Sequence, residues 1–188
     1  DRSVAVVNAA TGRVLAVWRD KRMTDLAVCP PGDRVVCLNG ERDLRVLLVD
    51  RSEGACRLLP NKFLRADCPI TAIAVHPATA LGLAMLQGGR LVSFEGKPHL
   101  SFKCTFDGQR QRRFVLRPCV AGADGRLVAA GTEDSRVLVW DADTGARLAE
   151  LHGHAATVNC VASSPTRECL LASASDDHTI RLWVPVAA

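Results

Sequence analysis

The stretch that decides the fold is RVLVWDADTGARLAELHGHAATVNCVASSPTRECLLASASDDHTIRLW, residues 136–183. Its apolar runs are short, and turn residues such as Thr144-Gly145 and Asp176-Asp177 separate them. None of the runs follows the helical period. Because short apolar runs between turn residues are typical of strands, this stretch predicts a series of antiparallel strands and no helix.

Gly153-His154 and, further on, Trp183 stand at the spacing of the WD40 repeat, which this stretch resembles. The resemblance implies one blade of a β-propeller, with a buried chain of hydrogen bonds through His154, Ser173, Asp177 and Trp183. Buried polar groups are costly unless each finds a partner, so such a chain would fix the register of the blade. We therefore interpret His154 and Asp177 as structural residues, not as catalytic or metal-binding ones.

The same pattern recurs towards the N-terminus in weaker copies. Val7, Val49 and Phe94 stand near the ends of apolar runs, at the places that Trp140 and Trp183 take in the last two copies. Their separations are close to the ~40–45 residues of this repeat. The chain therefore predicts a repeated four-stranded unit, even where tryptophan and the Gly-His pair are missing.

A second marker keeps the same period. Pro30, Pro77 and Pro165 each end an apolar run, and proline belongs at the turn leaving a strand because it cannot donate to the ladder. The predicted units are a half-blade at 3–18, full blades at 23–59, 70–104 and 114–151, and a last blade at 157–184 without its outer strand.

The predicted fold class is all-β, a WD40 β-propeller with about four to five blades present. We expect the chain to be the C-terminal part of a ring of about seven blades. An open ring leaves strand edges exposed, so further blades would come from other residues or from another chain.

The blade before the last keeps only part of the polar chain. Asp134 and Trp140 remain, whereas Ala130 stands where Ser173 does and Gln109 stands where a histidine is expected. The two earlier full blades keep almost none of it. We expect those blades to depend on apolar packing and to be the softer part of the ring.

The net charge of +4, from 24 basic and 20 acidic residues, gives no argument for nucleic acid binding. The chain has no Tyr, five Phe and three Trp, too few for a base-stacking platform. Its eight cysteines form no CxxC pair, which argues against a zinc site. We interpret them as reduced, buried small hydrophobes, which favours a cytoplasmic and also a nuclear location.

Residues 68–89 contain no charged side chain and are long enough to span a bilayer. Pro69, Pro77 and Gly82 interrupt them, and two apolar runs, 70–75 and 81–86, lie on either side of a turn. We therefore predict a hairpin of buried strands and no membrane partner.

No catalytic residue, metal site or cofactor site follows from the sequence. His152 and His154 would share one face of a strand, but no third metal ligand lies nearby. The serines have no nucleophile elbow, and no glycine loop could hold a phosphate. A hydrolase that uses a propeller face is the alternative from another class, and it lacks a visible nucleophile–base pair.

The most distinctive surface is a cluster of arginines, Arg110, Arg112 and Arg113, before the penultimate blade. In a propeller, this connection lies on the same side as the turns that carry Asp134 and Asp177. Such a cluster would hold an acidic peptide, a phosphate or another subunit, while the alternative is a solvated loop. The residues expected to share this face are Glu133, Asp176, His178, Lys62 and Arg65.

Three stretches are more specific than the repeat: RRFVLRPCVAG at 112–122, LAELHGHAATVNCV at 148–161 and ASASDDHTIRLWVP at 172–185. With them the chain resembles the C-terminal propeller of the WD-repeat subunit of the CTLH (GID) ubiquitin ligase. The resemblance implies a non-enzymatic scaffold that helps to assemble the complex and recruit substrates, with proteins as partners and no small-molecule substrate. The alternative is a WD40 structural subunit of another large assembly, ribonucleoprotein or cytoskeletal (axonemal).

Overall fold

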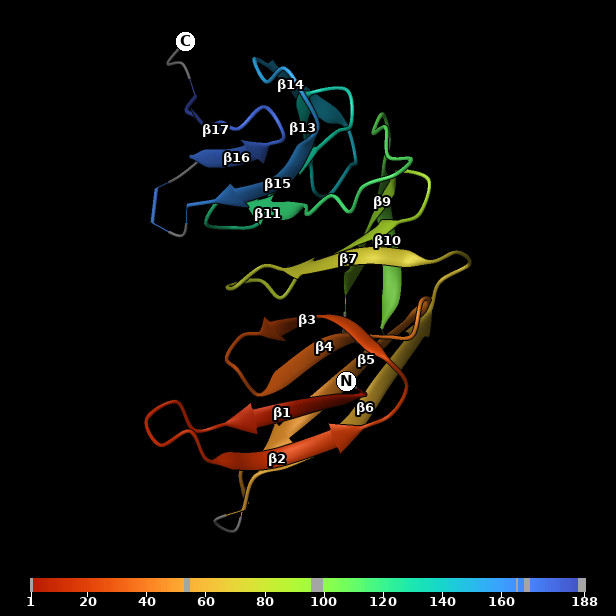
Figure 1. The fold of residues 1–188 in the computed structure, drawn as a ribbon, viewed down its shortest axis with the longest axis vertical. Helices are drawn as coiled ribbons and strands as arrows, with labels where there is room; N and C mark the ends of the chain where they lie inside the picture. Colours follow the sequence, from red (N-terminus) through yellow and green to blue (C-terminus); the bar gives the residue numbers. More distant parts are fainter. Residues whose placement is uncertain (1, 53–54, 96–99, 165, 168–169, 186–188) are drawn as a thin grey trace.

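A computed structural model describes residues 2–52, 55–95, 100–164, 166–167 and 170–185. In these residues seventeen strands form five antiparallel sheets and there is no α-helix (Figure 1). The chain is therefore the all-β propeller fragment that was predicted. Pro165 and Cys169 lie outside the described residues.

Each sheet is a meander in which consecutive strands pair. The N-terminal hairpin is β1 (Ser3–Val7) and β2 (Val14–Arg19). The first blade is β3 (Met23–Cys29), β4 (Arg34–Asn39), β5 (Asp43–Asp50) and β6 (Arg57–Arg65). The second blade is β7 (Ile70–Val75), β8 (Gly82–Leu86), β9 (Arg90–Glu95) and β10 (Ser101–Phe106). The third blade is β11 (Cys119–Ala121), β12 (Leu127–Gly131), β13 (Arg136–Asp141) and β14 (Arg147–His152), and the last sheet is β15 (Val158–Ser163), β16 (Leu171–Ser175) and β17 (Ile180–Trp183).

Two strand boundaries depart from the sequence pattern. Strand β6 continues to Arg65 and includes Pro60, which a sheet tolerates because β6 is the outer strand of its blade. Strand β11 begins at Cys119, and residues 107–118 form a loop instead of the start of a strand. Residues 68–89 contain the expected antiparallel pair, β7 and β8.

The blades follow one another in an open arc, and the first strand of each blade lies beside the first strand of the next (Figure 1). A parallel bridge between Arg117 and Cys160 joins the third blade to the last sheet. Further along the arc, Arg117 Nη1 lies 3.4 Å from both carboxylate oxygens of Asp25 in β3. The inner strands therefore form one continuous surface.

On one side of the molecule, the turn between the second and third strands of each blade meets the loop that enters that blade. We call this side the loop face. The backbone N–H···O=C bonds that define it are Gly40–Arg22 (2.7 Å), Gln87–Pro69 (2.8 Å), Glu133–Arg110 (3.0 Å) and Asp176–Thr157 (2.9 Å). Because one such bond recurs in every blade and in the last sheet, the loop face is a regular feature of the fold.

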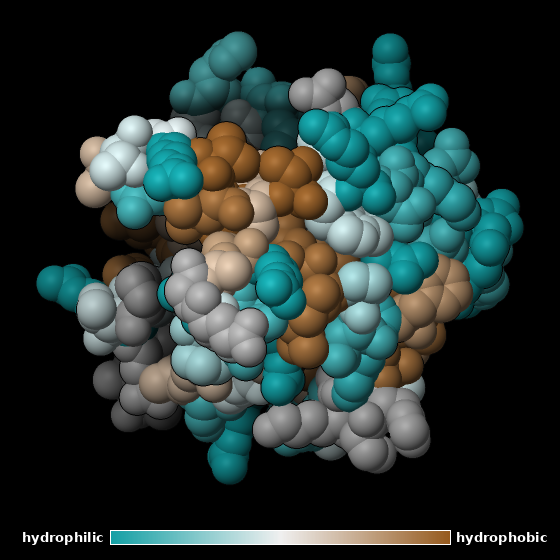
Figure 2. All heavy atoms as spheres, turned by 90° about the horizontal axis from the view of Figure 1, so that it is seen from below, coloured by the Kyte–Doolittle hydropathy of each residue, from teal (hydrophilic) through white to brown (hydrophobic). Residues whose placement is uncertain are grey.

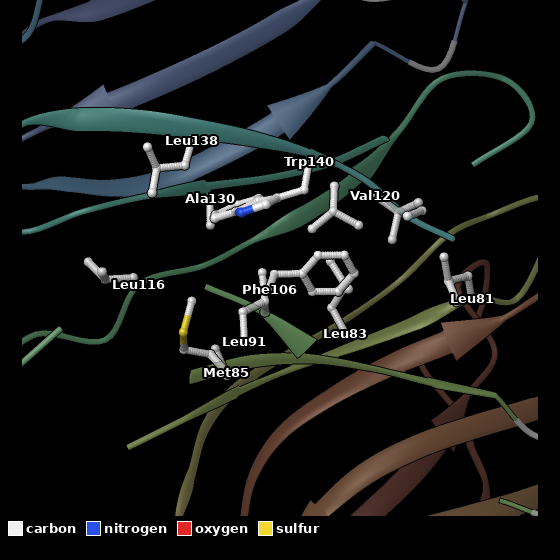
Figure 3. Packing of buried hydrophobic residues seen from close by; sticks show 13 residues of the cluster. Leu81, Leu83, Met85, Leu91, Phe106, Leu116, Val120, Ala130, Leu138 and Trp140 are labelled. Atoms are coloured by element: carbon white, nitrogen blue, oxygen red, sulfur yellow. The ribbon is translucent and has the colours of Figure 1, made fainter. Parts of the chain in front are cut away.

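Apolar clusters fill the spaces between adjacent sheets. Between the second and third blades, Trp140 packs against Phe106 with ring centroids 5.9 Å apart (Figure 3). Between the first and second blades, Phe94 takes the place of the tryptophan and covers Gly82, its partner across the β8–β9 pair. A Cβ on Gly82 would lie 2.2 Å from the Phe94 ring, so the ring occupies the space of a side chain.

Both ends of the arc expose apolar side chains. The N-terminal hairpin exposes Val7, Val14, Leu15 and Val17, and the view onto this end shows apolar groups gathered among polar ones (Figure 2). At the other end, Ile180, Leu182 and Val184 are exposed, and among the described strands β17 pairs only with β16. Exposed apolar patches of this kind mark surfaces that associate with other structure.

Only part of the expectation for the cysteines is correct. Cys29 and Cys37 are buried, and burial raises the pKa of the Cys37 thiol to about 11. The other described cysteines are half-buried, and all seven of the described cysteines carry free thiols. Across the described ranges, no helix is long and apolar enough to cross a bilayer.

Candidate protein-interaction face

The last sheet holds a chain of four hydrogen-bonded side chains. His154 Nδ1 lies 2.8 Å from Asp177 Oδ2, and His154 Nε2 lies 2.7 Å from Ser173 Oγ. The indole Nε1 of Trp183 donates to the same Ser173 Oγ at 2.8 Å. This chain of hydrogen bonds, which we call the relay, joins four parts of the sheet: the loop that enters it, its second strand, its turn and its third strand.

The donors in this relay can be assigned from the chemistry of each group. The Trp183 indole is only a donor, so Ser173 Oγ accepts from it and has its own O–H to give to His154 Nε2. His154 Nδ1 then carries the proton that it donates to the Asp177 carboxylate. Every member is satisfied, which is the condition for a buried polar network to stabilise its surroundings.

Asp177 is held ionised by its neighbours. The Thr179 hydroxyl donates to it at 2.7 Å, and although partial burial opposes this, the Ala155 amide and His154 add further donors. Together they keep the pKa of the Asp177 carboxyl well below its ordinary value. Because the pKa of Asp177 is lower in the folded chain than in the unfolded one, ionised Asp177 adds to the free energy of unfolding at neutral pH. This contribution is lost as the pH falls from the ordinary carboxyl pKa towards the lowered one.

We expect Ser173→Ala to lower the free energy of unfolding by about 2 kcal/mol, because two groups lose their shared partner. His154 Nε2 would lose its donor, and Trp183 Nε1 would lose its acceptor. Equilibrium urea unfolding measures the loss, with Ser101→Ala as the control because Ser101 is exposed. A Ser173→Ala variant as stable as the control would contradict the structural role of the relay.

The third blade keeps Asp134 and Trp140 but does not connect them. Asp134 is bound by Thr132 Oγ1 at 2.5 Å and by Arg136 Nη2 at 2.8 Å. The indole of Trp140 instead donates to the backbone carbonyl of Asp107 at 3.0 Å. The physical reason is that Ala130 supplies no hydroxyl between them, so each group has found a separate partner.

Gln109 lies in the loop that enters the third blade, where His154 lies for the last sheet. Its side-chain amide is buried, and neither its oxygen nor its nitrogen has a hydrogen-bond partner among the described residues.

An ion network through Arg136, Glu150 and Arg147 joins β13 to β14, with contacts of 2.7 and 2.8 Å. This network, in which Arg136 and Glu150 are half-buried, is the polar link of the third blade in place of the relay.

The loop at 107–118 is longer than the other connections into the blades, at 20–22, 66–69 and 153–157. Glu133 Oε1 accepts three successive backbone N–H groups of this loop, from Arg112 (2.7 Å), Arg113 (2.6 Å) and Phe114 (2.9 Å). Desolvation raises the pKa of Glu133, but the three amides outweigh it and hold that pKa below its ordinary value. The carboxylate therefore fixes the centre of the loop.

Buried groups hold the loop on either side of this carboxylate. Gln111 is buried, and its Nε2 donates to the Phe114 carbonyl at 2.7 Å and to Thr71 Oγ1 at 3.2 Å. Leu116 is fully buried in the cluster between the second and third blades. Neither residue was singled out from the sequence, because a glutamine or leucine in a loop carries no local signal of burial.

Of the residues predicted to share the loop face, most lie there. Glu133 and Asp176 belong to turns that define it, and Asp176 accepts from Asn159 Nδ2 at 2.5 Å. His178 is exposed in the same turn as Asp176. Arg65 ends β6 and lies 3.6 Å from Asp43, beside the first blade's turn.

The prediction for Lys62 was wrong. Lys62 lies inside β6 opposite Val46, not in the connection after the strand. It lines a cleft of about 610 Å³ between the first and second blades together with Pro30 and Pro31, which belong to the turn at the opposite side from the loop face. The cause is the length of β6, which runs six residues beyond the predicted boundary at 59 and ends at Arg65.

The fold and the relay define this chain as part of a WD40 β-propeller. Residues 118–141 and 145–184 match the family described as WD domain, G-beta repeat, and these residues are WD40 repeats.

Relatives that are similar to this chain across nearly its whole length include the following three. A WD repeat-containing protein WDS homolog of Arabidopsis thaliana is 30% identical over 93% of the chain and 32% of its own length. A WD repeat-containing protein 26 homolog of the same plant is 35% identical over 97% of the chain and 30% of its own length. GID complex subunit 7 of Schizosaccharomyces pombe is 25% identical over 92% of the chain and 34% of its own length. The chain thus spans about a third of the length of these relatives.

Proposed function

We propose that this chain is part of a non-enzymatic scaffold in a CTLH (GID)-type ubiquitin ligase, where it helps to assemble the complex and recruit substrates. The proposal rests on how much of this chain is similar to GID complex subunit 7. The match to the WD40 family covers only 118–141 and 145–184, whereas GID complex subunit 7 aligns over 92% of the chain. The similarity therefore includes the first two blades, where a shared repeat consensus does not explain it.

The loop face is the proposed surface for protein partners. A firmly held loop that projects exposed side chains loses little conformational entropy on binding, which favours association. The loop at 107–118 has this character, since Glu133 fixes its backbone while Arg112 and Arg113 remain exposed. We also propose a cytoplasmic location, and a nuclear one, because free cysteines are typical of reducing compartments.

Affinity purification from cells, followed by mass spectrometry, tests this proposal. The bait is the full-length protein that contains this chain, and the control bait lacks residues 1–188. We expect the complete bait to recover RING-bearing ligase subunits together with their associated scaffold subunits. Recovery of ribosomal or axonemal proteins without RING-bearing subunits would overturn the proposal and favour a structural subunit of another assembly.

A further inference from the structure

We propose that residues 112–115 of the loop face bind a peptide segment of a protein partner in which carboxylate side chains stand next to an apolar one. This inference rests on the proposed function as an interaction scaffold and adds the chemistry of the partner. It is carried by four consecutive exposed side chains, Arg112, Arg113, Phe114 and Val115, on a backbone that buried groups hold in place.

The two arginines provide positive charge that no ion pair among the described residues holds, although the charge of Arg112 also acts on the nearby carboxylate of Glu133. Within the described ranges, the guanidinium groups of Arg112 and Arg113 make no hydrogen bond and no ion pair, and Arg113 only lies over the Phe114 ring at 5.7 Å. Their neighbours differ, because Arg110 pairs with Asp134 at 3.5 Å and Arg117 pairs with Asp25. The charge that these two residues offer to a partner is therefore positive. An arginine side chain can donate two parallel hydrogen bonds to one carboxylate.

The next two residues provide an apolar contact beside that charge. Phe114 is 41% exposed and Val115 is 52% exposed, although the residues before and after the four, Gln111 and Leu116, are buried. Exposed aromatic and aliphatic groups next to arginine are the composition of interface centres. A partner with only acidic residues would leave them uncovered, so the segment must also carry an apolar side chain.

Glu133 holds the backbone beneath this surface, and it does not contribute to the attraction of an acidic peptide. Its carboxylate is occupied by three backbone amides, from Arg112, Arg113 and Phe114. These bonds hold the backbone of residues 112–114, and the side chains of residues 112–115 are exposed. Glu133 is thus a positioning residue, and its negative charge close to the arginines would by itself oppose an acidic ligand.

The test is fluorescence anisotropy with a labelled synthetic peptide of alternating glutamate and leucine, and with a matched peptide that has glutamine in place of glutamate. We expect the glutamate peptide to bind and the glutamine peptide to bind at least about tenfold more weakly. Binding should weaken as salt rises, because exposed charges are screened. Equal affinity for both peptides would overturn the proposal.

Charge reversal locates the site. We expect Arg112→Glu with Arg113→Glu to weaken binding of the glutamate peptide about tenfold or more. The control reverses Arg13 and Arg19, two exposed arginines of the N-terminal hairpin, and so keeps the same net charge. Equal losses in both variants would show that only the overall charge matters and would contradict the site.

Glu133→Ala separates positioning from charge, because alanine removes both the negative charge and the oxygen that accepts the three amides, whereas glutamine would keep an accepting oxygen. This change removes a negative charge near the arginines, so a purely electrostatic site would bind the glutamate peptide more tightly. If the held backbone matters, binding weakens instead, and unchanged urea midpoints for the whole chain show that folding is intact. Tighter binding would contradict the positioning role of Glu133.

Three further outcomes test the class of partner and separate this inference from the proposed function. A short RNA that binds as well as the peptide, and is lost in the same arginine variant, would contradict a protein partner. Failure of the peptide to bind while RING-bearing subunits still co-purify would refute the inference alone. Peptide binding without co-purification would refute the ligase proposal alone.

Discussion

Replacing Trp140 with alanine is expected to lower the free energy of unfolding by about 4 kcal/mol, within the range for removing a buried tryptophan. Trp140 is among the largest fully buried side chains and lies between the second and third blades (Figure 3). Its ring packs against Phe106, and its indole donates to the carbonyl of Asp107. The variant would therefore leave a cavity at this junction and loosen the start of the loop at 107–118.

Urea unfolding measures this loss of stability. A second variant at Trp140 separates the hydrogen bond from the packing, and a variant at Trp18 is the control. Trp140→Phe keeps an aromatic ring but removes the hydrogen bond to Asp107, so we expect a loss of about 1 kcal/mol. Trp18→Ala is the matched control, since Trp18 is half-buried in β2 and leaves a smaller cavity. Equal losses for Trp140→Ala and Trp18→Ala would show that the junction between the second and third blades is not a principal source of stability.

Gly131→Ala is expected to cost about 3 kcal/mol, at the upper end of what added groups in packed interiors cost. A Cβ on Gly131 would lie 2.1 Å from the backbone oxygen of Val158 and 2.7 Å from its Cβ. Val158 is fully buried, and its amide donates to the Thr132 carbonyl at 3.0 Å. Because the obstacle is backbone, the last sheet would have to move away from the third blade to admit one methyl group.

Hydrogen exchange and urea unfolding together test this prediction. We expect the amide of Val158 to lose protection in Gly131→Ala, since its bond to Thr132 stretches when the sheets separate. The control is Gly88→Ala, where φ is +92° and nothing lies within 4 Å of the added Cβ. That control carries only the backbone strain of a left-handed residue, about 1–2 kcal/mol. A Gly131→Ala variant no less stable than Gly88→Ala would mean that the two sheets are not in tight contact.

The sequence was sufficient for features that depend on residues close together in the chain or at a fixed repeat spacing. Strand alternation and turn residues act over a few positions, and they predicted the all-β fold and the meander of each blade. His154, Ser173, Asp177 and Trp183 belong to one blade, and the structure joins them by hydrogen bonds within that blade. The exposed arginines at 110–113 could also be picked out from their composition alone.

Only the tertiary structure decided features that depend on how blades and loops approach one another. The three amides held by Glu133, the partner that Asp25 supplies for Arg117 and the backbone contact at Gly131 join residues from different elements. Lys62 was misplaced for the same kind of reason, since the extension of β6 past Pro60 depends on pairing with β5. A repeat pattern specifies the strands of each blade but not the distance between neighbouring blades, and that distance is set by the side chains packed between them.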